Sequence, residues 1–225
     1  MKKNYTHVAV LIDRSGSMQR IKSDVIGGFN QLIEDQKKVP GDLTVSLIQF
    51  DENMGLQYDT LNDFSPINEV ILLDDSNYVP RGMTPLNDSL AKLINETGAR
   101  LASMDESDRP EKVLIVSITD GLENKSREHT KSSIKELISR QEGTYKWQFL
   151  YIGANQDAFA EGSDRGIKAN YKFDANAAGT KKMSKVMSST LTSYRSATSD
   201  SFNLAAALAE ESTKADREEA RESKK

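Results

Sequence analysis

Oxygen-bearing side chains are concentrated in one short stretch near the start of the chain, residues 13–17. Asp13, Ser15 and Ser17 occupy alternating positions, and Gly16 lets the backbone bend between the serines. A carboxylate and two hydroxyls form an incomplete set of hard ligands, and Mg²⁺ prefers oxygen ligands while keeping several of its waters. The stretch therefore predicts a site for a small hard cation. An ordinary turn in which Ser17 caps the next helix would use the same residues.

Two later stretches offer further oxygens at similar places. Asp120 follows the apolar run 113–119, as Asp13 follows the apolar run 8–12, and Thr84 precedes an amphipathic segment. If the two apolar runs are neighbouring parallel strands, their carboxyl ends meet at one crevice, which is where open sheets bind ligands. Two carboxylates placed close together repel each other and raise one pKa unless a cation lies between them. A metal ion is the simplest explanation for this arrangement.

Each of these residues also has a purely structural interpretation. Thr84 could cap the helix that Pro85 begins, and Asp120 with Gly121 could simply turn the chain. Three separate loops that each place hard oxygens at the same predicted edge are harder to explain in this way, so we favour the metal site.

The surrounding elements alternate between strand and helix patterns. This alternation predicts a mostly parallel sheet with helices on both faces. We expect strands at 8–12, 43–50, 113–119, 147–152 and 167–173, with a turn and an edge strand within 51–64. We expect helices at 18–38, after Thr84, around Ile134 to Ile138, around Phe159 and at 176–197. Residues 65–83 could form a short helix or a strand, and this question stays open.

Three local predictions follow from residue type. Gly27 and Gly28 inside a helical pattern predict close packing of that helix against the sheet. His7 is expected at a strand edge and His129 on a solvated helix surface. Residues 1–197 are expected to form one domain, followed by a polar C-terminal helix or tail at 198–225 that is frayed or disordered from Glu210 onward.

Composition excludes several classes of function. The chain has 225 residues, no cysteine, two histidines and a formal net charge of −4, with basic and acidic residues mixed along it. A disulfide framework, a thiolate nucleophile and a sulfur-ligated zinc site are therefore excluded, and a nucleic-acid footprint is not expected. The apolar part of the N-terminal stretch is too short for a signal peptide or membrane span. We expect a soluble protein in the cytoplasm.

The motifs DRSGS at 13–17, GMTPL at 82–86 and ITDG at 118–121 resemble, in this order, the metal-ion-dependent adhesion site of a von Willebrand factor type A domain. The resemblance extends over roughly residues 5–197, and the sequence around the motifs resembles stand-alone bacterial and phage members. It implies a Rossmann-like open sheet, mostly parallel with one antiparallel edge strand and helices on both faces. It also implies that Ser15, Ser17 and Thr84 ligate Mg²⁺ or Mn²⁺ through hydroxyls, and that Asp13 and Asp120 bind directly or through water.

The function implied by the resemblance is not enzymatic. It is metal-dependent binding of a protein whose exposed Asp or Glu completes the metal site, within a larger intracellular assembly. Metal-linked movement of the helix at 176–197 would be a switch in such a domain. Two alternatives remain: a Mg²⁺-dependent phosphoryl-transfer enzyme with Asp13 as nucleophile, and an oligomer scaffold with a vestigial site. The first is weakened because Ser15, rather than a second acid, stands two residues after Asp13, and because no P-loop pattern occurs.

Overall fold

Six strands form the central sheet of the computed structural model, which describes residues 1–154, 157–197 and 202–222. The strand order is β3-β2-β1-β4-β5-β6, and every neighbouring pair is parallel except β2 with β3. The strands are β1 (Lys2–Asp13), β2 (Asp42–Glu52), β3 (Leu56–Pro66), β4 (Pro110–Thr119), β5 (Gln148–Ala154) and β6 (Ala169–Phe173). This confirms the predicted α/β fold with one antiparallel edge strand.

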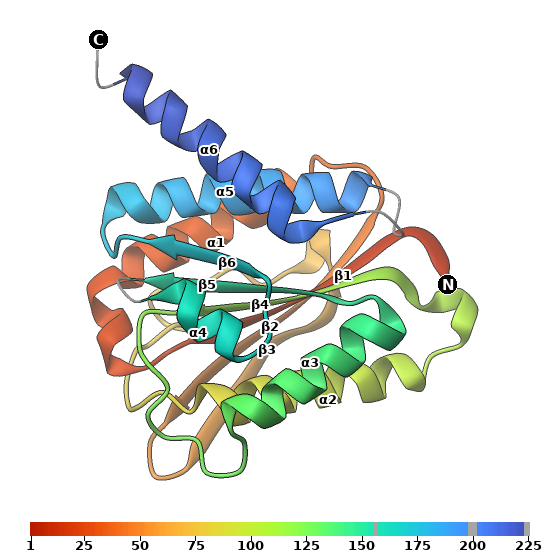
Figure 1. Cartoon of the computed structure of the whole chain (residues 1–225), viewed down its shortest axis with the longest axis horizontal. Coiled ribbons are helices and arrows are strands. Elements are labelled where there is room, and N and C mark those ends of the chain that lie inside the picture. Colours follow the sequence, from red (N-terminus) through yellow and green to blue (C-terminus); the bar gives the residue numbers. More distant parts are fainter. Residues whose placement is uncertain (155–156, 198–201, 223–225) are drawn as a thin grey trace.

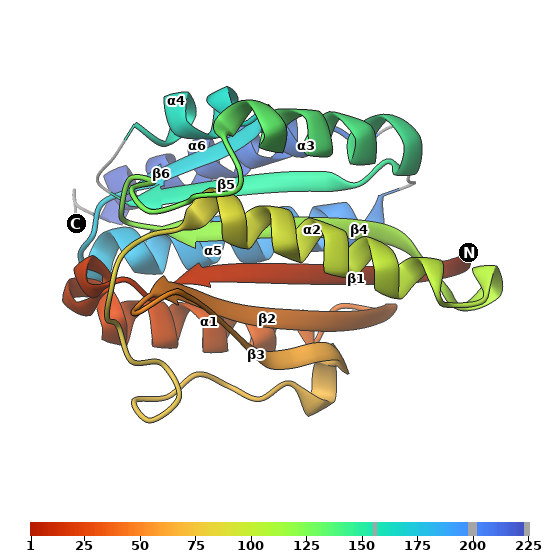
Figure 2. The ribbon, with the colours of Figure 1, turned by 90° about the horizontal axis from the view of Figure 1, so that it is seen from below.

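Helices cover both faces of this sheet (Figures 1 and 2). One face carries α1 (Lys22–Gln36) and α5 (Ala177–Ser196), with α6 (Leu204–Glu222) packed on α5 and β6. The other face carries α2 (Leu86–Ala102), α3 (Lys131–Tyr145) and α4 (Ala158–Asp164). Three short 3-10 turns are η1 (Gly16–Ile21), η2 (Ile67–Glu69) and η3 (Glu106–Asp108).

The central strand β1 is apolar at every position from 8 to 12 because helices cover both of its faces there. Val8, Val10 and Ile12 point into the core beneath α1 and α5, whereas Ala9 and Leu11 point into the core beneath α2 and α3. Successive side chains of a strand alternate between faces, so a strand covered on both sides needs apolar residues at every position.

The order in which the chain adds strands to the sheet reverses beside β1. It runs from β1 outward to β2 and β3, then returns through α2 to β4 on the other side of β1. Ile12 of β1 lies opposite Ile118 of β4, so the two strands end side by side. The predicted adjacency of these strands is confirmed, and their carboxyl ends form the topological switch point where open sheets bind ligands.

The C-terminal segment corrects one prediction. We expected residues 210–225 to be frayed or disordered, but α6 continues to Glu222, and residues 223–225 lie outside the described part of the chain. Leu204, Leu208 and Ala215 are buried against the neighbouring elements. Lys182 of α5 pairs with Asp216 at 2.5 Å and with Glu219 at 2.8 Å. The charged residues that suggested disorder instead join α6 to α5, and the end of α6 projects beyond the sheet (Figure 1).

The two histidines are also placed differently from the prediction. His7 lies fully buried in the middle of the sheet, stacked on Phe64 with ring centroids 3.6 Å apart. Burial lowers the pKa of His7 to about 3, so the ring is neutral. His129 lies just before α3 and not on it, and its main-chain N–H donates to Asp88 Oδ1 at 2.8 Å.

The glycine pair in α1 packs against a helix and not against the sheet. A Cβ on Gly28 would lie 2.4 Å from Ser184 Oγ of α5, whereas one on Gly27 would meet nothing within 4 Å. The prediction of close packing is therefore correct for Gly28, but the element packed against it is α5 and not the sheet.

Two buried cations anchor the far end of α5. Lys112 of β4 donates to the main-chain oxygens of Tyr194 at 2.9 Å, Arg195 at 2.8 Å and Ala197. Arg195 itself donates to the main-chain oxygen of Gln36, the last residue of α1, at 2.9 Å and to that of Val39, in the following turn, at 3.0 Å. Cations at a helix C-terminus satisfy its last carbonyls and oppose its dipole.

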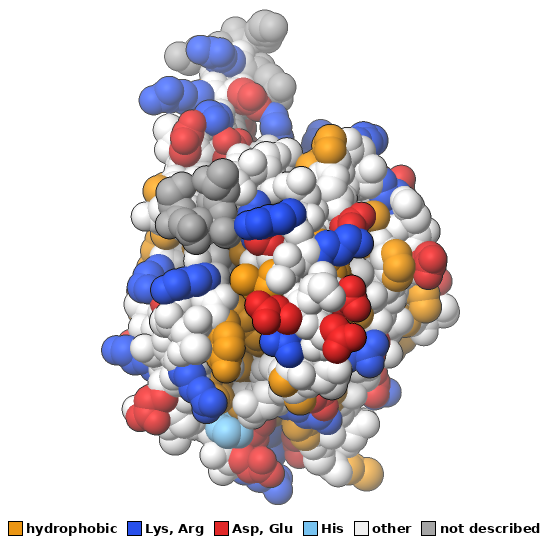
Figure 3. Space-filling view, turned by 90° about the vertical axis from the view of Figure 1, so that its right-hand side faces the viewer, with side chains coloured by type: hydrophobic (Ala, Val, Ile, Leu, Met, Phe, Trp, Pro, Cys, Tyr) orange, Lys and Arg blue, Asp and Glu red, His pale blue; other side chains and the backbone are white. Residues whose placement is uncertain are grey.

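The surface at the amino ends of the strands carries charges of both signs (Figure 3). Basic and acidic side chains are interspersed on this face around a groove with apolar side chains. Within the described parts of the chain, no helix combines the length and the apolar character that crossing a membrane requires.

Candidate functional site

Asp13, the last residue of β1, is fully buried and held by two hydrogen bonds. Its Oδ1 accepts from the main-chain N–H of Ser15 at 2.6 Å, and its Oδ2 accepts from the hydroxyl of Thr119 at 2.6 Å. The carboxylate orientation is therefore fixed by the end of β4 on one side and by the turn after β1 on the other.

The turn after β1 brings both predicted serines to Asp120. Ser15 Oγ lies 3.1 Å from Ser17 Oγ, and Ser17 Oγ donates to Asp120 Oδ1 at 2.6 Å. The other carboxylate oxygen of Asp120 accepts from the exposed guanidinium of Arg20 at 3.3 Å. Side chains that are about a hundred residues apart in sequence thus form one hydrogen-bonded cluster.

Thr84 approaches the same cluster from a third loop, and Gly121 lies between Thr84 and the serine turn. A Cβ on Gly121 would lie 3.0 Å from Thr84 Oγ1, 3.6 Å from Ser17 Oγ and 3.8 Å from Asp13 Oδ2. One small volume is therefore bordered by oxygens from two of the predicted loops and by Gly121 of the remaining loop, which also carries Asp120.

The capping alternatives for Thr84 and Ser17 are wrong. Helix α2 begins at Leu86 with Pro85 at the N-cap position and no side-chain cap, so Thr84 does not cap it. Ser17 lies inside η1, and its hydroxyl donates to Asp120 rather than serving as a helix cap. Neither hydroxyl is therefore used to cap a helix.

Burial dominates the electrostatics of Asp13. It raises the pKa of this carboxyl to about 6, against the lowering effect of the hydrogen bonds from Thr119 and Ser15. The charge of Asp120 raises the pKa further, but by less than burial does. The sequence argument considered only repulsion between the two carboxylates, and it did not foresee burial as the larger effect, because depth of burial is not visible in residue spacing. A buried carboxylate of this kind is stabilised by a nearby cation.

A buried ion-pair network that the sequence argument missed positions these loops. Arg14 donates through Nε to Asp51 Oδ2 at 2.6 Å, and Arg81 approaches the same oxygen at 3.3 Å. The main-chain N–H of Arg81 also donates to Arg14 O at 2.6 Å. The only sequence signal was an arginine between two candidate ligands. Its role is to connect the loop before Thr84 to β1 and β2.

Two further residues fix the same loop, which contains no regular helix after η2. The hydroxyl of the buried Tyr78 donates to Asp13 O at 2.7 Å. Gly82 has a φ of +69°, and a Cβ there would lie 2.3 Å from Glu52 O. A glycine is required at this position, because both the backbone conformation and the close approach of β2 exclude a side chain.

The loop after β4 is tied to Thr84 by direct hydrogen bonds. The side chain of Asn124 accepts from the main-chain N–H of Thr84 at 3.0 Å, and its own main-chain N–H donates to Thr84 O at 3.2 Å. Glu123 accepts from the main-chain N–H of Asn87 at 2.7 Å, close to the start of α2. These bonds hold Thr84 against the Asp120 loop.

The donor set suits a hard divalent cation. It consists of two carboxylates and three hydroxyls that either face the position of Gly121 or are joined by hydrogen bonds, which matches the oxygen preference of Mg²⁺ and Mn²⁺. Among the described residues, no three Asp, Glu, His or Cys side chains are grouped to hold a metal. The candidate site is therefore distinguished by its neutral hydroxyl oxygens and not by an acidic cluster.

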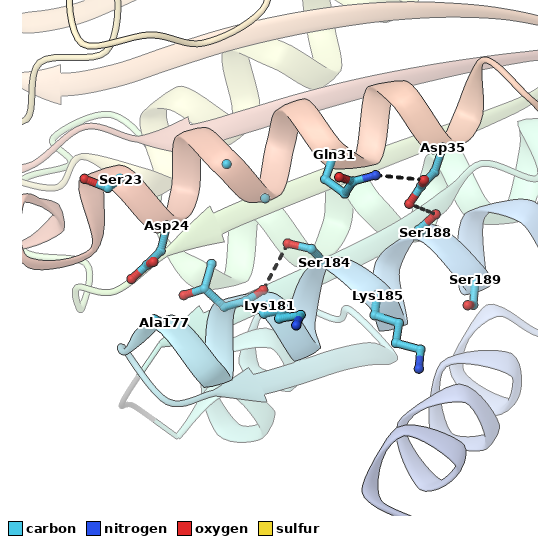
Figure 4. A pocket seen from close by; sticks show the side chains of 13 residues that line it. Ser23, Asp24, Gln31, Asp35, Ala177, Lys181, Ser184, Lys185, Ser188 and Ser189 are labelled. Carbon is cyan, nitrogen blue, oxygen red and sulfur yellow. Dashed lines mark hydrogen bonds between the residues drawn. The ribbon is translucent and has the colours of Figure 1, made fainter. Parts of the chain in front are cut away.

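A hollow elsewhere on the molecule has no comparable chemistry. It measures about 560 Å³ and lies between α1 and α5. Small polar side chains line it, and those labelled in Figure 4 bond mainly within and between the two helices, as Gln31 and Ser188 do to Asp35. It contains none of the predicted metal-binding residues.

Comparison of the sequence with protein-family models gives no match, and comparison with curated proteins gives none that is significant. The structure, in contrast, is similar to solved structures. Proximal thread matrix protein 1 from the mussel byssus superposes with a TM-score of 0.56 at 13% identity, over 82% of this chain and 45% of that one. This chain therefore spans less than half of the mussel protein.

Two further solved structures extend the comparison. Manganese-loaded TRAP protein of Plasmodium vivax matches with a TM-score of 0.51 at 17% identity, over 79% of this chain and 72% of that chain. A von Willebrand factor type A structure from Catenulispora acidiphila matches with a TM-score of 0.51 at 12% identity, over 81% of this chain and 42% of that chain. The chain has the von Willebrand factor type A fold.

Proposed function

We propose that this chain is a metal-dependent protein-binding module. Asp13, Ser15, Ser17, Thr84 and Asp120 would hold one Mg²⁺ or Mn²⁺ ion, and an Asp or Glu side chain of a protein partner would complete its coordination. The observation that carries the proposal is the convergence at Gly121: oxygens of two loops face this residue, and Ser17 donates to the neighbouring Asp120 of the third loop. Structures of the same fold agree with it, since one is described as manganese-loaded and another structure of the mussel protein as having zinc in the metal-ion-dependent adhesion site motif.

The residues of the chain would perform distinct tasks in this site. The ion supplies positive charge that attracts a carboxylate. Three of the five ligands are neutral hydroxyls, and one of the two carboxylates, Asp120, already shares its charge with Arg20, so the bound ion would keep part of its positive charge for a partner's carboxylate. The hydrogen bonds from Ser15 N–H and Thr119 hold Asp13 in place, so the protein needs little rearrangement on binding.

The phosphoryl-transfer alternative is disfavoured by the burial of Asp13. A nucleophilic carboxylate needs an oxygen that can approach phosphorus in line. Asp13 is 0% exposed, and both of its oxygens accept hydrogen bonds from within the protein. The geometry suits a carboxylate that orients other groups better than one that attacks a substrate.

The same proposal includes the cellular location and the kind of partner. We expect a partner within a larger cytoplasmic assembly, of the kind found with bacterial and phage proteins that the motifs resemble. Neither nucleic acid nor membrane is expected as a partner.

A peptide selection tests the proposal directly. A random 12-residue display library is bound to the immobilised full chain in Mg²⁺ and eluted with EDTA. Enriched peptides should share an Asp or Glu and should bind Thr84→Val at least about tenfold more weakly than wild type, because this isosteric change removes one ligand oxygen. Enrichment that is unaffected by EDTA, or no enrichment at all, contradicts the proposal and favours a scaffold with a vestigial site.

A further inference from the structure

Three large apolar side chains are exposed on the loops that carry or adjoin the candidate metal ligands. Met83 precedes Thr84 and is 47% exposed, and Leu122 lies two residues after Asp120 and is 57% exposed. Met54, in the turn between β2 and β3, is fully exposed at 102%. We refer to Met54, Met83 and Leu122 as the apolar platform. Single exposed apolar residues are common on protein surfaces, but neighbours on adjoining loops of one site suggest contact with another molecule.

The loops that carry the platform are joined into one unit. Glu52 and Met83 exchange two main-chain hydrogen bonds of 3.0 Å, which connects the turn carrying Met54 to the loop carrying Thr84. Asn124 then bonds to Thr84 in both directions, which connects that loop to the one carrying Leu122. The platform is therefore positioned relative to the metal ligands before any partner arrives.

The charges around these loops are balanced. The side chain of Glu52, near the centre, lies 4.0 Å from Lys125 and 3.8 Å from Arg127. A neutralised acid in this position neither repels an incoming carboxylate strongly nor offers a strong separate anchor. Apolar contact is therefore the interaction that these loops offer, while the exposed guanidinium of Arg20, in η1, lies at Asp120.

The backbone at Met54 supplies an independent observation. Met54 has a φ of 60°, a left-handed conformation that favours Gly, Asn or Asp over a long apolar side chain. Three other non-glycine residues share a positive φ and have local reasons: Asn4 is a favoured type, Phe64 stacks on His7, and Lys146 ends α3. Met54 combines an unfavourable conformation with full exposure, so folding does not explain its residue type.

We infer that the partner presents its metal-binding Asp or Glu on a segment with apolar side chains on either side, and that these side chains contact the apolar platform. This inference rests on the proposed metal-dependent function. Two of the three platform residues are methionines, whose flexible thioether chains adapt to partners of different shape. The occupant is thus an acidic and apolar protein segment.

The test uses the peptides selected in Mg²⁺ and measures their affinity for platform variants of the full chain. Met54→Asn suits the left-handed turn, so its thermal midpoint should equal or exceed that of wild type, and Leu122→Asn changes an exposed residue. Each should weaken peptide binding at least about tenfold while Mn²⁺ affinity stays unchanged. Tyr145→Asn is the matched control, since Tyr145 is 57% exposed on α3, next to the start of β4 at the opposite end of the sheet.

Each outcome decides between the two claims. Enriched peptides should carry an apolar residue within a few positions of the shared acid. If peptides bind in a Mg²⁺-dependent way but both platform variants bind them as wild type does, the inference is overturned and the proposed function stands. If no peptide requires Mg²⁺, the proposed function itself fails. Equal weakening by Tyr145→Asn would also overturn the inference, because the effect would not be specific to the platform.

Discussion

Replacing Gly121 with alanine would place a methyl group at the border of the candidate metal space. The new Cβ would lie 3.0 Å from Thr84 Oγ1 and 3.6 Å from Ser17 Oγ. Ordinary contacts between such atoms begin near 3.4 Å, so the Thr84 hydroxyl must retreat by a few tenths of an ångström. Mg²⁺ tolerates little departure from octahedral geometry. Changes next to metal ligands typically cost about 10- to 100-fold in affinity, or about 1.4 to 2.8 kcal/mol.

The effect of Gly121→Ala should be confined to metal binding. Gly121 is not among the glycines with a positive φ, so the backbone accepts an alanine, and metal-free stability should change by less than about 1 kcal/mol. Gly143→Ala on α3 is the matched control, because a Cβ there meets nothing within 4 Å. It should leave metal affinity unchanged and raise stability by about 0.5 to 1 kcal/mol.

Mn²⁺ titration followed by electron paramagnetic resonance, together with thermal denaturation without metal, measures both effects of Gly121→Ala. If this variant binds Mn²⁺ as tightly as wild type, the oxygens around Gly121 do not enclose the ion. A large loss of metal-free stability would show instead that the glycine serves packing.

Three further predictions concern the fold around the site. His7 has a folded pKa of about 3 and an unfolded pKa near 6.5, so the unfolded state binds more protons between these pH values. The free energy of unfolding therefore decreases as the pH is lowered, by about 2 kcal/mol at pH 5. His7→Phe, which can keep the ring stacked on Phe64, should show a shallower loss in acid denaturation; an unchanged slope would contradict the burial argument. Lys112→Met should lower the free energy of unfolding by about 2 to 3 kcal/mol in urea, because the carbonyls at the end of α5 lose their donor, and a loss below 0.5 kcal/mol would be inconsistent with that role. Leu208→Ser should cost about 2 kcal/mol in the same assay if α6 packs as described, and no change would mean that α6 contributes nothing to stability.

The strands and the convergence of the three loops could be predicted from the sequence. Apolar runs such as 8–12 and 113–119 identify strands buried on both faces, and a carboxylate after each run locates the edge of the sheet. The adjacency of β1 and β4 then follows from how parallel strands connect, and the structure confirms it. Thr84 could be placed at the same edge only by its resemblance to a motif, because the segment before it has no periodic pattern.

What the sequence could not show depends on long-range contacts. Arg14 reads as a charged residue in a turn, and only the approach of Asp51 and Arg81 makes it a buried connection between loops. The charges in α6 read as solvated, because the lysines that pair with them lie on α5, more than thirty residues away. His7 reads as an edge residue because its stacking partner, Phe64, belongs to β3, a distant segment of the chain.

Metal binding by the five oxygen ligands is the central claim, and Mn²⁺ binding to wild type, Asp13→Asn and Thr84→Val tests it most directly. Electron paramagnetic resonance counts the ions bound per chain, and circular dichroism confirms that each variant is folded. We predict one bound ion in wild type and at least about tenfold weaker binding in both variants, because each loses part of the oxygen set. The absence of a bound ion in wild type at millimolar Mn²⁺, or equal binding by folded variants, would contradict the account.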